Sequence, residues 1–221
     1  MNTILITGAG TGLGKELALA YAKRGHRIIL VGRTVGTLIE VKKLIENTNG
    51  SSTVATCDIS NIQSVTELIE RLKKTENIDM LINNAGIGYF GNLQDMSMEG
   101  INHMIDTNVK GTIFMTKEVL PLFLEQQSGS IMNIISTAGL RGKVKESAYV
   151  ASKFAIRGFT ESLIKELKPT SIKVSAVYMG GMNTPFWNGT DFIKDMSKLK
   201  SAKLVAKEIV EREEEEEIII N

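Results

Sequence analysis

The stretch ILITGAGTGLGKELA, residues 4–18, passes from a short apolar segment through a glycine-rich turn into a segment of helical periodicity. The apolar residues before the turn predict a buried strand. Gly8, Gly12 and Gly14 open the predicted helix, where a side chain would keep a pyrophosphate away from the backbone N–H groups and from the positive end of the helix dipole. An ordinary glycine-rich turn is the alternative, but the strand before it and the helix after it favour a dinucleotide-binding turn.

Six apolar runs rich in Ile and Val alternate with longer amphipathic stretches along the chain. Runs this apolar suit strands that are covered on both faces, as in a parallel sheet between two layers of helices. We therefore predict an α/β fold with a single Rossmann-type doubly wound parallel sheet and helices on both faces. One domain is expected over residues 1–221, with a short C-terminal substrate region at about 185–221. The ligand crevice of such a sheet lies beyond the carboxyl ends of its strands. The predicted strands are Thr3–Thr7, Arg27–Val31, Thr53–Thr56, Met80–Ile82, Ser130–Ile135 and Lys173–Tyr178.

The composition argues against several classes of protein. A chain of 221 residues with 43% apolar residues fits one globular domain of ordinary size. Its 26 basic and 25 acidic residues leave a net charge of +1, so no long-range field indicates nucleic acid or a membrane surface as a partner. The single cysteine, Cys57, cannot form an intramolecular disulfide, and the chain starts without a secretion leader, so we expect a cytoplasmic protein. No apolar run approaches the roughly 18 residues of a transmembrane helix.

Tyr149 and Lys153 are four residues apart in a predicted helix, so a phenol and an ammonium project from the same face. Moving the pKa of a tyrosine from about 10 to about 7 needs roughly 4 kcal/mol of preferential stabilisation of the phenolate. One opposite charge at about 4 Å and an effective dielectric of about 20 contributes roughly that much, less what desolvation of the phenolate removes. The pair therefore predicts an acid catalyst in which Lys153 lowers the pKa of Tyr149.

Five motifs in register along the chain resemble those of the short-chain dehydrogenase/reductase family over residues 1 to about 184. The family's pattern is a T-G-x-x-x-G-x-G turn, an N-N-A-G segment, a helical Asn, a Ser and Y-x-x-x-K. Any one motif alone is a weak match, but five at the family's usual spacings are together specific. Met179 departs from the pattern, because the family usually has Pro at this position. The matching residues are Thr7–Gly14, Asn83–Gly86, Asn108, Ser136 and Tyr149 with Lys153.

The resemblance implies an oxidoreductase in which Tyr149 is the general acid in carbonyl reduction and the base in the reverse direction. It further implies that Lys153 holds the nicotinamide ribose, that Ser136 positions the carbonyl oxygen, and that Asn108 supports a water-linked proton path from Lys153. Each residue alone also has a purely structural explanation. Tyr149 could be a packed aromatic residue and Lys153 a solvated helix residue. Ser136 could be a hydroxyl at a strand end, and Asn108 a polar residue within a helix. The full spaced set favours catalysis.

Cofactor choice is predicted from the end of the second strand, where an acidic residue would bind the ribose 2′-OH of NAD and repel a 2′-phosphate. Arg33 occupies this position without a carboxylate beside it, so we expect NADP(H), with NAD(H) possible if Arg33 is only a solvated turn residue. Asp58 resembles the family's adenine-contacting aspartate, although with Ser60 it could instead begin a helix. The remaining cofactor residues implied by the resemblance are Gly8, Thr11, Gly12, Leu13, Gly14, Asn84, Ala85, Gly86, Tyr149, Lys153, Gly180 and Thr184.

The side chains expected to contact the substrate are mainly apolar and aromatic. Such a wall suits a small hydrophobic ketone, aldehyde or diketone, although the same side chains could equally close the core. A 3-oxoacyl thioester on an acyl carrier protein is the alternative substrate, with Arg141, Lys143 and Lys145 as carrier contacts. A sensor that binds NADP(H) without turnover is an alternative of a different class, and it would predict a damaged catalytic set. The expected substrate residues are Tyr89, Phe90, Leu140, Val144, Phe186 and Trp187.

Members of the family commonly assemble through the helices that correspond here to residues 101–124 and 149–167, so we expect a homodimer or homotetramer. The small residues of the second helix would allow close approach of a partner helix, or would equally pack within the subunit. His26 lies in a turn and His103 lies alone on a predicted helix, so neither a metal site nor a Ser-His-Asp triad is expected.

The segment after Thr184 is shorter than in many members of the family, which predicts a comparatively open substrate pocket. Residues 201–211 have helical periodicity, and residues 218–220 predict a last edge strand. The five glutamates between them, residues 213–217, predict a solvated turn, with an acidic docking tail as the alternative.

Overall fold

The computed structural model describes residues 1–190 and 192–220, so Asp191 and Asn221 of the expected C-terminal substrate region lie outside the described residues. β7 (Met182–Asn183) and β8 (Lys200–Ser201) form a small parallel pair beside the main sheet. In the described part of the chain, seven parallel strands form the main sheet, in the spatial order β3 (Ser51–Thr56), β2 (Arg27–Gly32), β1 (Thr3–Thr7), β4 (Met80–Asn83), β5 (Gly129–Ile134), β6 (Ile172–Met179) and β9 (Glu217–Ile220).

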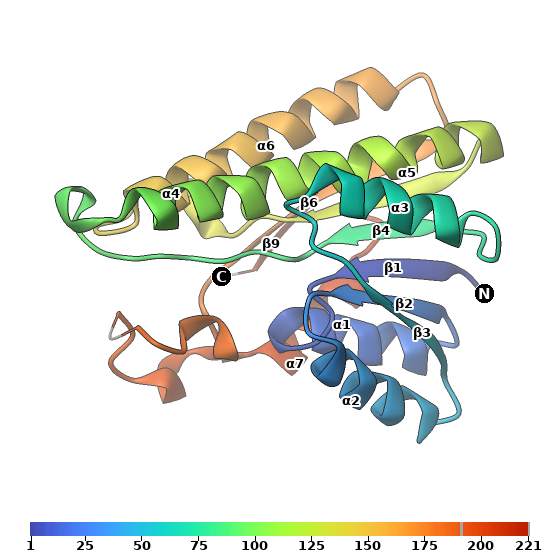
Figure 1. The fold of residues 1–221 in the computed structure, drawn as a ribbon, viewed down its shortest axis with the longest axis horizontal. Helices are drawn as coiled ribbons and strands as arrows, with labels where there is room; N and C mark the ends of the chain where they lie inside the picture. Colours follow the sequence, from blue (N-terminus) through green and yellow to red (C-terminus); the bar gives the residue numbers. More distant parts are fainter. Residues whose placement is uncertain (191, 221) are drawn as a thin grey trace.

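Helices cover both faces of the sheet, which gives the three layers seen in Figure 1. The lower layer in that view is formed by α1 (Gly12–Lys23), α2 (Val35–Glu46) and α7 (Ala202–Glu211). The upper layer is formed by α3 (Ile62–Leu72), α5 (Thr112–Gln126) and α6 (Ser147–Leu167), with α4 (Met98–Met104) joined to α5 by a π-helical segment, Ile105–Gly111.

The alternation of side chains along each strand explains why both faces are covered. Ile4 and Ile6 of β1 are buried in one core, which includes side chains of α1, α2 and α7. Leu5, between them, is buried in the second core, which includes side chains of α3, α5 and α6. Because successive side chains of a strand point to opposite faces, a run of three apolar residues needs a layer on each side.

Two buried asparagines tie the sheet to the upper helices. Asn83 of β4 and Asn133 of β5 lie opposite one another in register. The Nδ2 of Asn83 donates hydrogen bonds to Thr116 Oγ1 at 3.0 Å and to Asn133 Oδ1 at 2.9 Å. The Nδ2 of Asn133 donates in turn to Thr160 Oγ1 at 2.9 Å. A displacement of β4 or β5 relative to α5 or α6 would break these bonds and leave buried amide groups without partners, which is costly. The network therefore fixes the two strands relative to the two helices.

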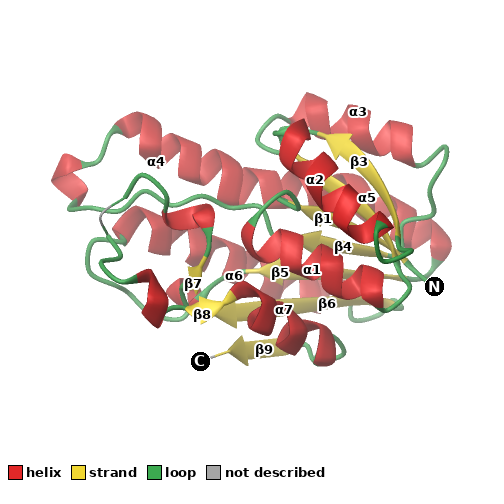
Figure 2. Ribbon diagram, turned by 90° about the horizontal axis from the view of Figure 1, so that it is seen from below, coloured by secondary structure: helices red, strands yellow, loops and turns green. Residues whose placement is uncertain are grey.

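The predicted fold class is confirmed, and the predicted strands match the observed ones to within a few residues at each end. The tail follows the prediction as well. Residues 212–216 form a solvated turn after α7, where Glu213 pairs with Arg24 at 3.3 Å and Glu215 pairs with Arg212 at 2.7 Å. Beyond this turn Ile218 and Ile220 are buried in β9, which pairs with β6 at the sheet edge seen in Figure 2.

Among the helices that the structure describes, none has both the length and the apolar character needed to cross a bilayer.

The amide network generates a prediction about stability. Replacing Asn133 by Ala removes the donor to Thr160 and the acceptor of Asn83, so the free energy of unfolding should fall by about 1–3 kcal/mol. Asn102→Ala, on the exposed face of α4, is the matched control and should change it by less than about 0.5 kcal/mol. Urea unfolding followed by circular dichroism measures both, and equal stabilities of the two variants would show that the network contributes nothing.

Candidate active site

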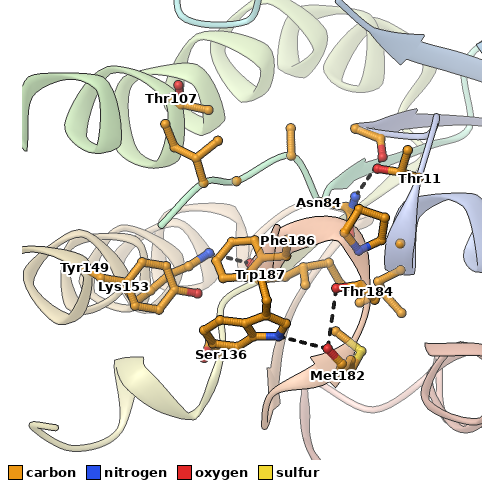
Figure 3. Close-up of a pocket in the computed structure, with 18 of the residues that line it drawn as sticks. Thr11, Asn84, Thr107, Ser136, Tyr149, Lys153, Met182, Thr184, Phe186 and Trp187 are labelled. Atoms are coloured by element: carbon orange, nitrogen blue, oxygen red, sulfur yellow. Dashed lines mark hydrogen bonds between the residues drawn. The ribbon is translucent and has the colours of Figure 1, made fainter. Parts of the chain in front are cut away.

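A cleft of about 340 Å³ lies beyond the carboxyl ends of the strands. Its lining comes from the turns after β1, β2, β3, β4, β5 and β6 and from α6. Most of the predicted site residues therefore share one surface, although they are far apart in sequence (Figure 3). The predicted residues that line the cleft are Gly8, Thr11, Gly12, Leu13, Arg33, Asp58, Asn84, Ala85, Gly86, Ser136, Tyr149, Lys153, Gly180, Thr184, Phe186 and Trp187.

The glycines of the first turn are required by close backbone contacts. Gly8 has a φ of +65°, and a Cβ placed on it would lie 2.9 Å from the Cα of Ala85. A Cβ on Gly14 would lie 2.3 Å from the carbonyl oxygen of Gly8. Gly12, with a φ of +54°, begins α1 and faces Thr184, whose Cβ would be 3.4 Å from an added Cβ. The turn thus packs against the backbone of Ala85 and the side chain of Thr184, and its residues Gly8, Thr11, Gly12 and Leu13 line the cleft.

A set of hydrogen bonds joins this turn to the segment after β4. Thr7 Oγ1 donates to the carbonyl oxygen of Ile82 at 3.3 Å and accepts from the backbone N–H groups of Asn84 and Ala85, both at 3.0 Å. Asn84 Nδ2 donates back to the carbonyl oxygen of Thr7 at 2.9 Å. This reciprocal pairing fixes the positions of the two cleft-lining turns relative to each other.

The end of the cleft after β2 and β3 carries Arg33 and Asp58. Asp58 Oδ1 accepts from Ser60 N at 3.0 Å and from Ser60 Oγ at 2.7 Å, while the N-cap of α3 is Asn61, whose Oδ1 accepts from Ser64 N. The geometry therefore places Asp58 in a turn before the helix, not at its N-cap.

His103 contacts two polar side chains, those of Arg33 and Tyr89, which its place on the predicted helix did not indicate. Its Nε2 lies 3.4 Å from Arg33 Nη1, and its Nδ1 lies 2.9 Å from the hydroxyl oxygen of Tyr89. The spacing of these three residues along the chain gives no signal of the contact, because they come from a strand end, a loop and a helix. Neither of the two contacts involves the cysteine or carboxylate ligands that would accompany a histidine at a zinc site.

Tyr149 and Lys153 lie side by side on α6, as Figure 3 shows. Lys153 Nζ is 5.7 Å from the centroid of the Tyr149 ring and donates to the carbonyl oxygen of Ile134 at 3.3 Å. Both side chains are buried. Burial lowers the pKa of Lys153 to about 8. Burial also raises the pKa of Tyr149 well above its usual value. A hydrogen bond with Ser136 opposes this rise in the pKa of Tyr149, and the charge of Glu146 adds to it.

The direction of the Tyr149 shift is opposite to the sequence-based expectation. That expectation considered one opposite charge at about 4 Å and treated desolvation as a smaller correction. In the structure desolvation is the largest cause of the shift in the pKa of Tyr149, and it acts on Lys153 too. The tyrosine is therefore held in its neutral, proton-bearing form, with the amino group of Lys153 5.7 Å from the centroid of its ring.

Asn108 lies within the π-helical segment and does not line the cleft. Its Oδ1 accepts from Ile87 N at 2.8 Å, and its Nδ2 donates to Ile87 O at 2.9 Å and to Ser152 Oγ at 3.0 Å. A Cβ on Gly86 would lie 3.4 Å from Asn108 Oδ1 and 3.5 Å from Lys153 Nζ. The side chains of Asn108 and Lys153 thus border the same space over Gly86.

Ser136 follows β5 with a φ of +112°, a conformation that L residues rarely adopt. Its Oγ accepts from the backbone N–H of Ala138 at 3.2 Å. Strained residues held in place by their surroundings concentrate at functional sites. Here the strain positions a buried hydroxyl beside that of Tyr149.

Four aromatic side chains form a cluster over Tyr149. Phe90 packs against Tyr149 with ring centroids 5.4 Å apart, and Phe186 packs against the same ring at 6.0 Å. Phe90 also stacks on Trp187 at 5.1 Å and on Phe192 at 4.7 Å. Phe186 of the short segment after Thr184 therefore covers the tyrosine, while a pocket more open than in longer members of the family stays a prediction. Phe192 was missed, because a lone aromatic residue beyond the motifs gives no signal of its contacts.

Four of the expected substrate residues do not line the cleft, although one of them, Phe90, packs against the Tyr149 ring. Leu140 packs against a separate core cluster that includes Ile135 and Tyr178, and Val144 is 85% exposed. Tyr89 faces His103 and, together with Phe90, lines a second pocket of about 300 Å³. Residues that sequence reasoning did not assign to the substrate or cofactor also line the cleft, namely Cys57, Ile59, Thr107, Lys143, Glu146 and Met182. Each is close in sequence to a recognised motif, but only the folded turns show which way it faces.

Comparison with known proteins agrees with this geometry. The family model for short chain dehydrogenases matches residues 2–191 of this chain. An uncharacterized oxidoreductase of Staphylococcus saprophyticus is 37% identical over 191 residues, which cover 85% of this chain and 81% of that protein. Sepiapterin reductase of Chlorobaculum tepidum is 32% identical over 198 residues, covering 86% of this chain and 81% of that protein. A short-chain dehydrogenase from Sphingobium yanoikuyae in complex with NADPH has a TM-score of 0.91 at 26% identity, covering 99% of this chain and 86% of that one.

The packing of the glycine turn predicts opposite effects of one substitution at two helical glycines. Gly14→Ala forces a methyl group onto the carbonyl oxygen of Gly8 and should lower the free energy of unfolding by about 1–3 kcal/mol. Gly36→Ala, in the first turn of α2 with open space around it, should raise it by about 0.5–1 kcal/mol. Chemical denaturation of both variants tests this, and a Gly14→Ala protein as stable as the parent would refute the steric requirement.

Proposed function

The chain belongs to the short-chain dehydrogenase family of oxidoreductases, and from this premise we propose that it reduces the carbonyl group of a hydrophobic ketone, aldehyde or diketone to an alcohol, with NADP(H) as cofactor. The observation that carries the proposal is the burial of Tyr149 beside Lys153 in the cleft that the glycine turn also lines. A phenol and an ammonium in one water-poor site form a proton donor with a charge to stabilise the developing phenolate.

The residues of the cleft fit a nicotinamide dinucleotide. The glycine turn leaves backbone N–H groups of α1 open at the cleft, and Gly180 has open space where a Cβ would be. We assign the pyrophosphate to the turn at Gly8–Gly14 and the nicotinamide end to Gly180 and Thr184. A bound nicotinamide supplies the hydride, and the protein supplies orientation and the proton.

In this proposal each catalytic side chain has one task. Tyr149 donates its hydroxyl proton to the substrate oxygen, and the neutral form favoured by burial keeps that proton in place. Lys153, held by Ile134 O, stabilises the phenolate that results. The Ser136 hydroxyl orients the carbonyl oxygen toward Tyr149. Asn108, fixed by Ile87 and Ser152, supports replacement of the proton through the space over Gly86 that it shares with Lys153.

Two alternatives remain distinct from this proposal. In a 3-oxoacyl thioester reductase, the carrier protein would bind at Arg141 and Lys145, which are exposed, whereas Lys143 faces the cleft. In a sensor that binds NADP(H) without turnover, the catalytic set would not need to be complete. Ser136, Tyr149 and Lys153 line one cleft, and Asn108 borders the space over Gly86 beside Lys153, and this complete set favours an enzyme.

We also propose that the protein forms a homo-oligomer through α5 and α6. Leu124 and Phe154, on these two helices, expose 46% and 41% of their surface. Apolar side chains exposed on neighbouring helices suit a contact between copies of the chain.

The experiment that tests the function follows the oxidation of NADPH and NADH with a panel of ketones, aldehydes, diketones and 3-oxoacyl thioesters. Tyr149→Phe removes the transferable proton and should lower kcat/KM at least about 100-fold, while NADPH binding, measured by calorimetry, stays intact. NADPH binding without turnover across the panel would support the sensor, and full activity of Tyr149→Phe would exclude this proton donor.

Arg33 is predicted to select the phosphorylated cofactor. A guanidinium that binds a 2′-phosphate contributes roughly 1.5–3 kcal/mol, so Arg33→Ala should weaken NADPH binding about 10- to 100-fold and leave NADH binding nearly unchanged. Arg141→Ala, which removes the same charge from an exposed position, is the control for the net charge. Equal losses for NADPH and NADH would place Arg33 outside 2′-phosphate recognition.

A further inference from the structure

Glu146 is a buried carboxylate in the cleft that the proposed reaction does not use. It immediately precedes α6, yet its side chain makes no capping hydrogen bond to the helix N-terminus. The residue before it, Lys145, has a φ of +62° and accepts a hydrogen bond from Gly91 N at 2.9 Å through its carbonyl oxygen. This fixed turn leaves Glu146 lining the cleft, with only 8% of its surface exposed.

The carboxylate of Glu146 lacks a close partner. Among residues 1–190 and 192–220, its one ion pair is with Lys143 at 4.0 Å, the outer limit of such a contact, and no described side chain or backbone group donates a hydrogen bond to it. Lys143 Nζ itself donates to Thr137 Oγ1 at 3.2 Å. A buried carboxylate without hydrogen-bond donors is costly. The burial raises the pKa of Glu146, which reflects the same lack of donors.

Glu146 shares the cleft with the reacting end of the site. It precedes Tyr149 by three residues at the start of α6, a spacing that places two side chains on neighbouring positions of one helix face. Its charge acts on Tyr149, whose pKa it raises. Because Glu146 and Lys143 line the same cleft as Tyr149 and Ser136, a substrate with its carbonyl at Tyr149 and Ser136 can extend toward Glu146 and Lys143.

We propose that Glu146 and Lys143 form a polar subsite for a substrate hydroxyl group, so that the cleft takes hydroxy ketones and hydroxy aldehydes. A hydroxyl group both donates and accepts, which matches a carboxylate acceptor beside an ammonium donor. A substrate ammonium would be attracted by Glu146 but repelled by Lys143, and a substrate carboxylate the reverse, so the pair favours neither charge over a neutral hydroxyl. The aromatic side chains Phe90, Phe186 and Trp187 contact the apolar remainder of the substrate. This inference rests on the proposed carbonyl reduction and specifies its substrate class.

Four matched ketones test the subsite: acetophenone and its analogues with a hydroxyl, an amino or a carboxylate group at the neighbouring carbon. The parent protein should reduce 2-hydroxyacetophenone with a kcat/KM about 10- to 100-fold above that of acetophenone, and should not favour the charged analogues. In Glu146→Leu this preference should fall to near one, and Glu146→Gln, which keeps one acceptor oxygen, should be intermediate. Glu166→Leu, at the exposed far end of α6, should retain the full preference.

Binding supplies a readout that does not depend on turnover. Calorimetry should show tighter binding of 1-phenyl-1,2-ethanediol than of 1-phenylethanol to the parent protein, and the difference should be lost in Glu146→Leu. Reduction of all four ketones without a preference for the hydroxyl would overturn the subsite while leaving the proposed function standing. A preference for the amino ketone would also overturn it. A protein that favours the diol in binding but reduces none of the ketones would support the subsite and count against the reductase.

Discussion

The reciprocal hydrogen bonds between Thr7 and Asn84 are the constraint on which the site depends. They join the turn after β1 to the turn after β4, and they hold the two backbones so close that Gly8 cannot carry a side chain, while Gly14 lies against the Gly8 carbonyl and the Asn84 side chain. The position of Gly86 follows from this pairing, and Gly86 in turn lies beside Lys153 and Asn108. The turn that suits a pyrophosphate and the side chains that suit proton transfer are therefore parts of one rigid arrangement at the carboxyl ends of the strands.

The other half of the site is set by burial. The aromatic cluster and the strand ends remove Tyr149 and Lys153 from water. This desolvation raises the pKa of Tyr149 and lowers the pKa of Lys153, so it favours the neutral form of each side chain. Two residues with positive φ, Ser136 and Lys145, lie in the loop between β5 and α6. The side chains of Ser136, at the start of this loop, and of Glu146 and Tyr149, just after Lys145, line the cleft. Backbone strain here fixes side-chain direction, as at many functional sites.

The sequence was sufficient to predict the layers, the parallel strands and the motif residues, because apolar runs, glycine positions and the Tyr149–Lys153 spacing have direct physical meanings. It was insufficient wherever the outcome depends on how loops fold over the sheet. Leu140 and Val144 lie between two motif residues, yet one joins a separate core and the other faces solvent. The contacts of His103 with Arg33 and Tyr89 join three segments that no local pattern connects. The direction of the Tyr149 pKa shift could not be predicted either, because it depends on how completely the cleft is closed.

The aromatic cluster has an optical consequence. Trp187 is the only tryptophan of the chain, and it lines the cleft, stacked on Phe90 and hydrogen-bonded through its indole N–H to the carbonyl oxygen of Met182 at 2.9 Å. All the indole fluorescence of the protein therefore originates at the candidate active site. Quenching or a spectral shift of that emission is a label-free signal of events in the cleft, with no background from tryptophans elsewhere.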